Sequence, residues 1–180
     1  MPTTRVEEGG VYAIQRLDRG QSGFEGGLRF DRRTLNATPI GGAREIERAF
    51  DNWSASAAVF TRPGPGLFLG LSLAHNARAP SEVELFADGV HIATAAYETG
   101  DTTLDSEKVT TLEATAHYDR GRIAGDLHVY GSKYDSFIDE RPTGATFDAD
   151  GELFPVYRFV QTGADFYGLE IEGSYALWEA

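Results

Sequence analysis

Apolar and polar residues alternate with a period of two along several stretches of this chain. In the clearest stretch, 67–77, leucine occupies positions 67, 69, 71 and 73, while glycine, serine and alanine stand at 70, 72 and 74. Successive side chains of a β-strand point to opposite faces, so this pattern predicts a strand with one apolar face. A face made of leucines needs an apolar neighbour, which is either a second packed sheet or lipid.

The same alternation recurs along the chain and predicts about seven strands. The other strands are expected within 10–18, 24–31, 52–61, 111–118, 123–130 and 156–178. Between two of them, Arg120 and Gly121 form a predicted two-residue hairpin turn, which would place Glu113 opposite His128 and His117 diagonal to Asp126. In this register apolar positions meet apolar positions across the hairpin.

Short turns alternate with long loops, and the long loops are expected at 38–47, 81–108 and 142–154. The last predicted strand, 156–178, is longer than the roughly 9 to 11 residues that a strand needs to cross a bilayer. Alternating short and long connections are typical of outer-membrane barrels. We therefore predict an all-β fold, an antiparallel meander that forms a partial transmembrane β-barrel of about seven strands without a crossover helix.

Charge and motif content limit the classes of function. The formal net charge of -12 disfavours nucleic acid as a partner, because both would be negative. No arrangement of serine, cysteine or histidine indicates a catalytic nucleophile, and no glycine-rich turn between a strand and a helix indicates phosphate binding. The sequence therefore predicts no enzyme, no catalytic residues and no permanently bound cofactor.

The predicted loop 81–108 is the candidate functional element, because a long loop within a chain of short turns is usually functional. Its titratable residues are Glu82, Glu84, Asp88, His91, Glu98, Asp101, Asp105 and Glu107. Imidazole and carboxylate groups are accepted ligands of zinc, so His91, Glu98 and Asp101 are candidate metal ligands. The alternative is that His91 is an ordinary solvent-exposed loop histidine.

Two regions carry a resemblance to a known family. The first comprises 78–80, 84–86, GVHIAT at 89–94, 97–101, Leu104 and Glu107, and the second is YRFVQTGADFYGLE at 157–170. These segments resemble the β-barrel of TonB-dependent outer-membrane receptors. The GVHIAT sequence is similar to a Gly-x-His-x-Ala-Thr stretch in the zinc-uptake subgroup of that family.

The resemblance implies a place in the outer membrane of a Gram-negative bacterium, with lipid around the barrel. It also implies uptake of a metal ion or metal chelate, a zinc or iron complex, with His91 as the first candidate for the metal contact. The plug domain, TonB box and signal peptide of such receptors are not recognised in the sequence, and the expected strands are far fewer than the family's roughly 22. We therefore expect residues 1–180 to be an incomplete barrel domain, which meets the TonB complex only through a missing segment of a full-length receptor.

A soluble or small-barrel β-protein that binds a ligand or partner through its long loops is the alternative. The two hypotheses differ in where the apolar face lies: a soluble protein buries it in a dry core, whereas a membrane barrel presents it on the convex side. One face is predicted to carry Leu69, Leu71, Leu112, Ala114, Leu127, Val129, Leu169 and Ile171. The opposite face is predicted to carry Glu113, His128, Glu170 and Glu172.

Overall fold

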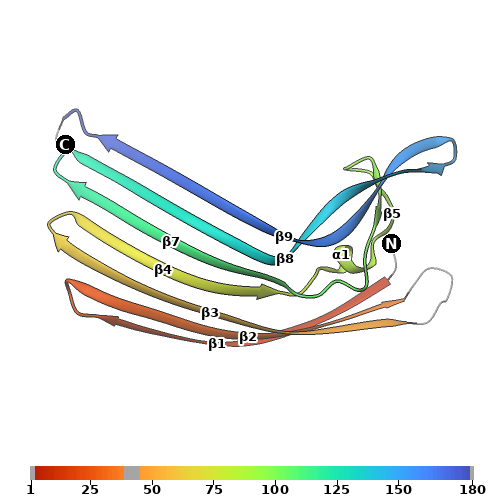
Figure 1. Cartoon of the computed structure of the whole chain (residues 1–180), viewed down its shortest axis with the longest axis horizontal. Coiled ribbons are helices and arrows are strands. Elements are labelled where there is room, and N and C mark those ends of the chain that lie inside the picture. Colours follow the sequence, from red (N-terminus) through yellow and green to blue (C-terminus); the bar gives the residue numbers. More distant parts are fainter. Residues whose placement is uncertain (1–2, 39–44, 179–180) are drawn as a thin grey trace.

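The computed structural model describes residues 3–38 and 45–178, which form mainly long β-strands (Figure 1). Seven of these strands make an antiparallel meander in which sequence neighbours are also neighbours in the sheet. They are β1 (Thr3–Asp18), β2 (Ser22–Thr38), β3 (Ile46–Gly64), β4 (Leu67–Arg78), β7 (Glu107–Arg120), β8 (Ile123–Ala149) and β9 (Glu152–Tyr175). The predicted all-β meander is confirmed. Most of the expected loop 38–47 lies outside the described residues.

One row of side chains shows how the faces are arranged. Leu71 pairs with Ala114, Ala114 with Val129, and Val129 with Leu169, so the row crosses four strands on a single face. Leu69, two residues before Leu71, begins a neighbouring row on the same face, which continues through Ala116, Leu127 and Ile171. The predicted shared apolar face is confirmed.

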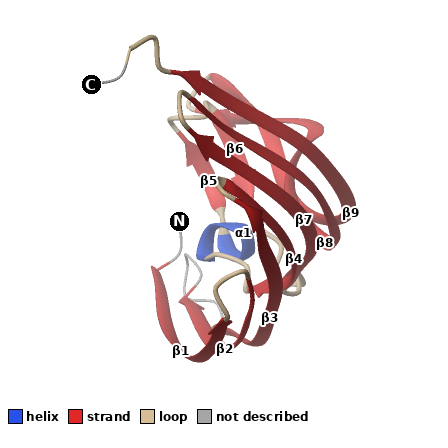
Figure 2. Ribbon diagram, turned by 90° about the vertical axis from the view of Figure 1, so that its left-hand side faces the viewer, coloured by secondary structure: helices blue, strands red, loops and turns tan. Residues whose placement is uncertain are grey.

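The apolar face is the convex one. Helix α1 (Glu82–Phe86) lies within the concavity of the curved sheet (Figure 2). Leu85 of this helix packs in one cluster with Leu35 of β2 and Phe50 of β3, which therefore point to the concave side. Alternation along the paired strands then puts Leu71 and Leu169 on the opposite, convex side, where Leu169 is 63% exposed. Nothing in the described chain covers this face with a second sheet.

The hairpin of β7 and β8 has a different register from the predicted one. Arg120 pairs with Ile123, so Gly121 and Arg122 form the turn, and Glu113 lies opposite Tyr130. Gly121 has a φ of 65°, a left-handed conformation that glycine adopts without steric cost and that the first turn position of this hairpin requires. Because the correction is a shift of two residues, every side chain keeps its predicted face.

The predicted loop at 142–154 is wrong, since β8 and β9 continue through it as a paired arm. Only Asp150 and Gly151 connect the strands, with φ angles of 55° and 91°. Two successive positive φ angles are typical of a tight Asp-Gly hairpin turn. Register shifts between Tyr134 and Phe137 and between Pro142 and Thr146 interrupt the ladder, and the arm bends at this end of the sheet (Figure 1).

The predicted loop 81–108 contains secondary structure that was not predicted. After α1 it forms a hairpin of β5 (Asp88–His91) and β6 (Ala96–Thr99). Strand β6 then pairs in parallel with β9, with Tyr97 opposite Val156 and Thr99 opposite Arg158. The prediction of a purely antiparallel sheet is therefore wrong at this one pairing, because the extended arm brings β9 alongside the loop.

The buried core lies on the concave side, where the loop meets the sheet. Its members come from β2, β3, β8 and the segment 79–104, and are Leu35, Ala37, Phe50, Ala79, Leu85, Phe86, Leu104 and Ile138. Burial of these side chains fastens the loop to the inner face of the sheet. In the described residues no helix has both the length and the apolar character needed to cross a membrane.

Candidate functional site

Helix α1 begins with a reciprocal cap that sets the path of the loop. Ser81 Oγ accepts a hydrogen bond from the Glu84 backbone N–H at 3.2 Å, and Glu84 Oε2 accepts one from the Ser81 backbone N–H at 2.7 Å. This is a capping box, which satisfies two backbone donors that a helix start would otherwise leave free. The short helix therefore has a defined start despite having only five residues.

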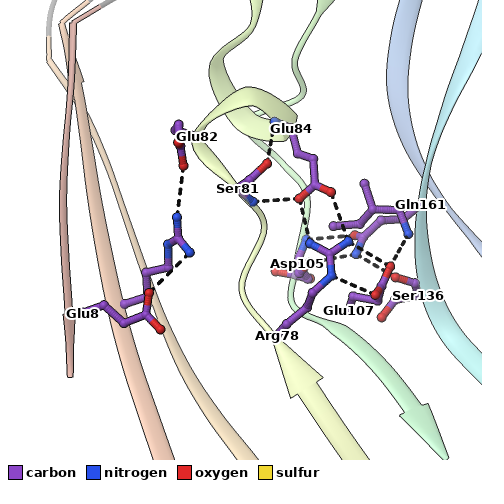
Figure 3. Close-up of polar contacts among 11 residues, drawn as sticks. Glu8, Arg78, Ser81, Glu82, Glu84, Asp105, Glu107, Ser136 and Gln161 are labelled. Carbon is purple, nitrogen blue, oxygen red and sulfur yellow. Dashed lines mark hydrogen bonds and ion pairs between the residues drawn. The ribbon is translucent and has the colours of Figure 1, made fainter. Parts of the chain in front are cut away.

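Arg78 joins the two ends of the loop (Figure 3). Its Nη1 donates to Glu84 Oε2 at 2.9 Å, and its Nε donates to Glu107 Oε1 at 2.9 Å. Glu107 is only 8% exposed, and its Oε2 also accepts from the Ile138 backbone N–H at 2.8 Å. The guanidinium group thus neutralises two carboxylates that would be costly to bury unpaired.

Polar contacts also tie the loop to both halves of the sheet. On one side, Arg33 of β2 contacts Glu82 at 3.0 Å, and Arg48 of β3 donates to the Leu104 carbonyl oxygen at 2.8 Å. On the other side, the side-chain amide of Gln161 of β9 makes a pair of hydrogen bonds with the Asp105 backbone, at 2.8 and 2.7 Å (Figure 3). The loop is therefore held across the concave side of the sheet.

The structure brings two of the three predicted metal ligands together. His91 Nδ1 lies 2.7 Å from Glu98 Oε1, and the Thr94 hydroxyl donates to the same oxygen at 2.9 Å. Glu98 is 4% exposed, whereas the His91 side chain is 49% exposed. In the tautomer in which His91 Nδ1–H donates to Glu98 Oε1, Nε2 is the ring nitrogen that keeps a free lone pair. Within the described chain, Nε2 makes no hydrogen bond.

Asp101 is engaged elsewhere. Arg158 Nη2 donates to its Oδ2 at 2.9 Å, and the backbone N–H of Thr103 donates to its Oδ1 at 2.9 Å. The hydrogen bonds from Thr103, together with the charge of Arg158, hold the pKa of Asp101 below its ordinary value. Among the residues that the structure describes, no three histidine, aspartate or glutamate side chains gather closely enough to hold a metal ion.

Sequence reasoning missed a further carboxyl group beside Glu98. The Oε1 atom of Glu140, on the β8–β9 arm, is buried and makes no hydrogen bond within the described chain. Burial raises the pKa of Glu140, and the negative charge of Glu98 raises it further. No sequence signal could have found this residue, since it lies between the predicted strand 123–130 and the predicted loop 142–154.

Solved structures with the same fold are receptors and transporters. The copper transporter OprC matches 97% of this chain with a TM-score of 0.78 and 17% sequence identity. The siderophore receptor PirA from Pseudomonas aeruginosa matches 93% with a TM-score of 0.57 and 14% identity. The ferric enterobactin receptor PfeA from the same organism, as its R480A/Q482A mutant, matches 98% with a TM-score of 0.52 and 16% identity.

The chain spans only part of these larger proteins: 27% of the OprC chain, 39% of the PirA chain and 34% of the PfeA chain. A family model described as "TonB dependent receptor-like, beta-barrel" matches residues 1–180, the whole of the chain. The meander, the convex apolar face and the loop on the concave side are features of such a barrel. This chain therefore belongs to the TonB-dependent receptor β-barrel family.

Proposed function

We propose that this chain forms part of the barrel wall of an outer-membrane receptor that takes up a metal ion or a metal chelate. The observation that carries the proposal is the contrast between the two faces of the sheet. The convex face presents rows of leucine and other aliphatic residues, while the concave face holds a folded loop rich in carboxylates. Lipid is the proposed neighbour of the convex face, because it is the solvent in which such a face is stable.

The proposed location is the outer membrane of a Gram-negative bacterium, and the proposed energy-coupling partner is the TonB complex. The described sheet is open, with β2 as the single neighbour of β1. An open sheet leaves unpaired backbone groups at its edge, which a bilayer does not tolerate. We therefore propose an incomplete barrel domain, closed by further strands of a full-length receptor that also supplies the TonB contact.

The cargo is proposed from the loop. His91 would bind a metal through Nε2, and Glu98 would hold the imidazole ring in place from the other nitrogen, an arrangement common at metal sites. Asp101 is a proposed further ligand. To bind the metal, its carboxylate would give up the ion pair with Arg158. The similarity of GVHIAT to the zinc-uptake subgroup supports zinc, while the names of the matched structures support copper or an iron siderophore.

The soluble β-protein is disfavoured by the position of the apolar face. A dry core would require the leucine rows to be buried, but Leu71 is 48% exposed. No enzymatic activity is proposed, and the names of the matched structures describe transport and reception.

Uptake by the full-length receptor tests this proposal. Cells that depend on the receptor are supplied with zinc, copper or a ferric siderophore, and uptake of one of these is expected. In the receptor with His91→Ala, affinity for the transported metal should fall about tenfold or more, as for the loss of other groups that position or bind a metal. His75→Ala is the matched control, because His75 belongs to β4 and bonds Thr110 on the convex side.

Unchanged metal affinity in His91→Ala would eliminate His91 as a ligand while leaving the uptake function standing. Absence of uptake for all three cargoes would refute the function itself.

A further inference from the structure

A second group of histidines and carboxylates lies on the concave face, in the wall and away from the loop. His117 of β7 and His128 of β8 are diagonal neighbours, because His117 pairs with Asp126 and Thr115 pairs with His128. Residues in this relation are about 7 to 8 Å apart at Cα, within joint reach of two imidazole rings. Both alternate with residues of the convex apolar rows, such as Ala116 and Leu127, so both face the concave side.

Each of these histidines is held by a carboxylate from the other strand. His117 Nδ1 lies 2.6 Å from Asp126 Oδ1, and His128 Nδ1 lies 3.0 Å from Glu113 Oε1. In the tautomer in which each Nδ1–H donates to its carboxylate, Nε2 keeps its lone pair and makes no hydrogen bond within the described chain. Histidines that bind metals almost always have their other nitrogen engaged in this way.

The next strand, β9, adds two carboxylates to this group, and the described chain supplies no ion pair for either of them. Glu170 of β9 lies directly opposite His128, and Glu172 lies directly opposite Asp126. Glu172 and Asp126 are like charges directly opposite each other, which destabilises a sheet, and within the described residues neither Glu170 nor Glu172 forms an ion pair or hydrogen bond. A cation bound at this position would relieve the repulsion.

We propose that His117 and His128 form a transit site for a divalent first-row transition-metal cation on the inner wall. The two Nε2 atoms bind the ion, water completes its coordination, and Glu170 and Glu172 attract it electrostatically. Imidazole nitrogen favours copper, nickel and zinc over magnesium or calcium. With two protein ligands the ion is held loosely enough to leave again, which suits a site on a path. The inference rests on the proposed function in one respect, that the concave face is the one along which the cargo moves.

Binding of Cu²⁺ to the full chain in detergent micelles tests the site directly. The chain has four histidines, so the double variant His75→Gln/His91→Gln leaves His117 and His128 as its only imidazoles. This protein should bind one Cu²⁺, with electron paramagnetic resonance showing coupling to two imidazole nitrogens. An excess of Mg²⁺ should not displace the Cu²⁺.

Two further substitutions in the His75→Gln/His91→Gln variant distinguish binding by His117 and His128 from non-specific attraction of Cu²⁺ by carboxylates. His117→Gln should reduce the coupled nitrogens to one and lower Cu²⁺ affinity about tenfold or more. Glu172→Gln breaks no contact within the described chain, so the fold should persist while affinity falls several-fold. Absence of nitrogen coupling, or equal affinity in all these proteins, would overturn the proposal. This binding readout does not depend on uptake, so its failure is distinguishable from failure of the proposed function.

Discussion

Replacement of Arg78 by alanine should loosen the loop without unfolding the sheet. Arg78 donates to both Glu84 and Glu107, and no other side chain joins these two carboxylates within the described chain. After Arg78→Ala, Glu107 keeps the hydrogen bond from the Ile138 backbone N–H, and Glu84 keeps the one from Ser81. What is lost is the neutralising charge and four donor contacts.

The magnitude follows from how deeply the pairs are buried. Breaking a fully buried ion pair costs about 3 to 5 kcal/mol, whereas an exposed pair contributes about 0 to 1 kcal/mol. The Arg78 side chain is 46% exposed, but those of Glu84 and Glu107 are 14% and 10% exposed, so the case lies between these limits. We expect the free energy of local loop opening to fall by about 2 to 3 kcal/mol, which corresponds to roughly a 30- to 150-fold change.

Hydrogen exchange of the loop amides measures this opening. The Leu85, Ala87 and Asp101 amides donate to carbonyl oxygens within the loop and report on its closed state. Their protection should fall by the factor above in Arg78→Ala and by less in Arg78→Lys, because lysine cannot form the same forked contacts. Arg32→Ala is the matched control, since its pair with Asp51 is exposed at 3.3 Å, and it should change protection less than about fivefold. Protection in Arg78→Ala equal to that in Arg32→Ala would refute the assignment of Arg78 as the residue that holds the loop.

Two other predictions concern the wall and the pH response. Leu71→Arg in the full-length receptor should destabilise the barrel in lipid vesicles by about 2 to 4 kcal/mol, and Ser72→Arg on the concave face by much less; equal costs would argue against lipid contact. Burial raises the pKa of Glu84, but hydrogen bonds from Arg78 and Ser81 outweigh it and hold the pKa below the ordinary value of 4.5. The stabilisation by Glu84 should therefore be complete above about pH 4.5 and be lost as the pH falls further. Protection of the Leu85 amide from hydrogen exchange should then decrease in acid. The decrease should be smaller in Arg78→Ala, which lacks the partner of Glu84.

The strands and their faces could be predicted because alternation with period two leaves a direct trace in the sequence. The register of the β7–β8 hairpin was harder to predict. A turn at Arg120-Gly121 and a turn at Gly121-Arg122 both fit the alternation of apolar and polar residues, and the structure has the second. The arm formed by β8 and β9 was missed because Pro142 and Gly144 resemble loop residues, whereas the register shift between Pro142 and Thr146 accommodates them within the paired strands.

The contents of the loop could be predicted only in part. The sequence Ser81-x-x-Glu84 is a capping-box pattern and was a readable signal for α1. The contact between His91 and Glu98 follows from the β5–β6 hairpin, which the acidic composition of the segment concealed. The contacts of Arg78 with Glu107 and of Asp101 with Arg158 join residues far apart in sequence, so only the folded sheet reveals them.

The ties between the loop and both halves of the sheet imply an order of folding. Arg33 meets Glu82 across 49 residues, while Gln161 meets Asp105 across 56 residues in the other direction along the chain. Contacts over such separations require that long chain segments be closed first, whereas the hairpins between adjacent strands close early. The loop can therefore reach its final conformation only after β2 and β9 have both been placed. The parallel pairing of β6 with β9, which fastens the β5–β6 hairpin to the arm, would then be among the last contacts to form, so a chain that stalls during folding would display its long strands before this hairpin is fixed in place.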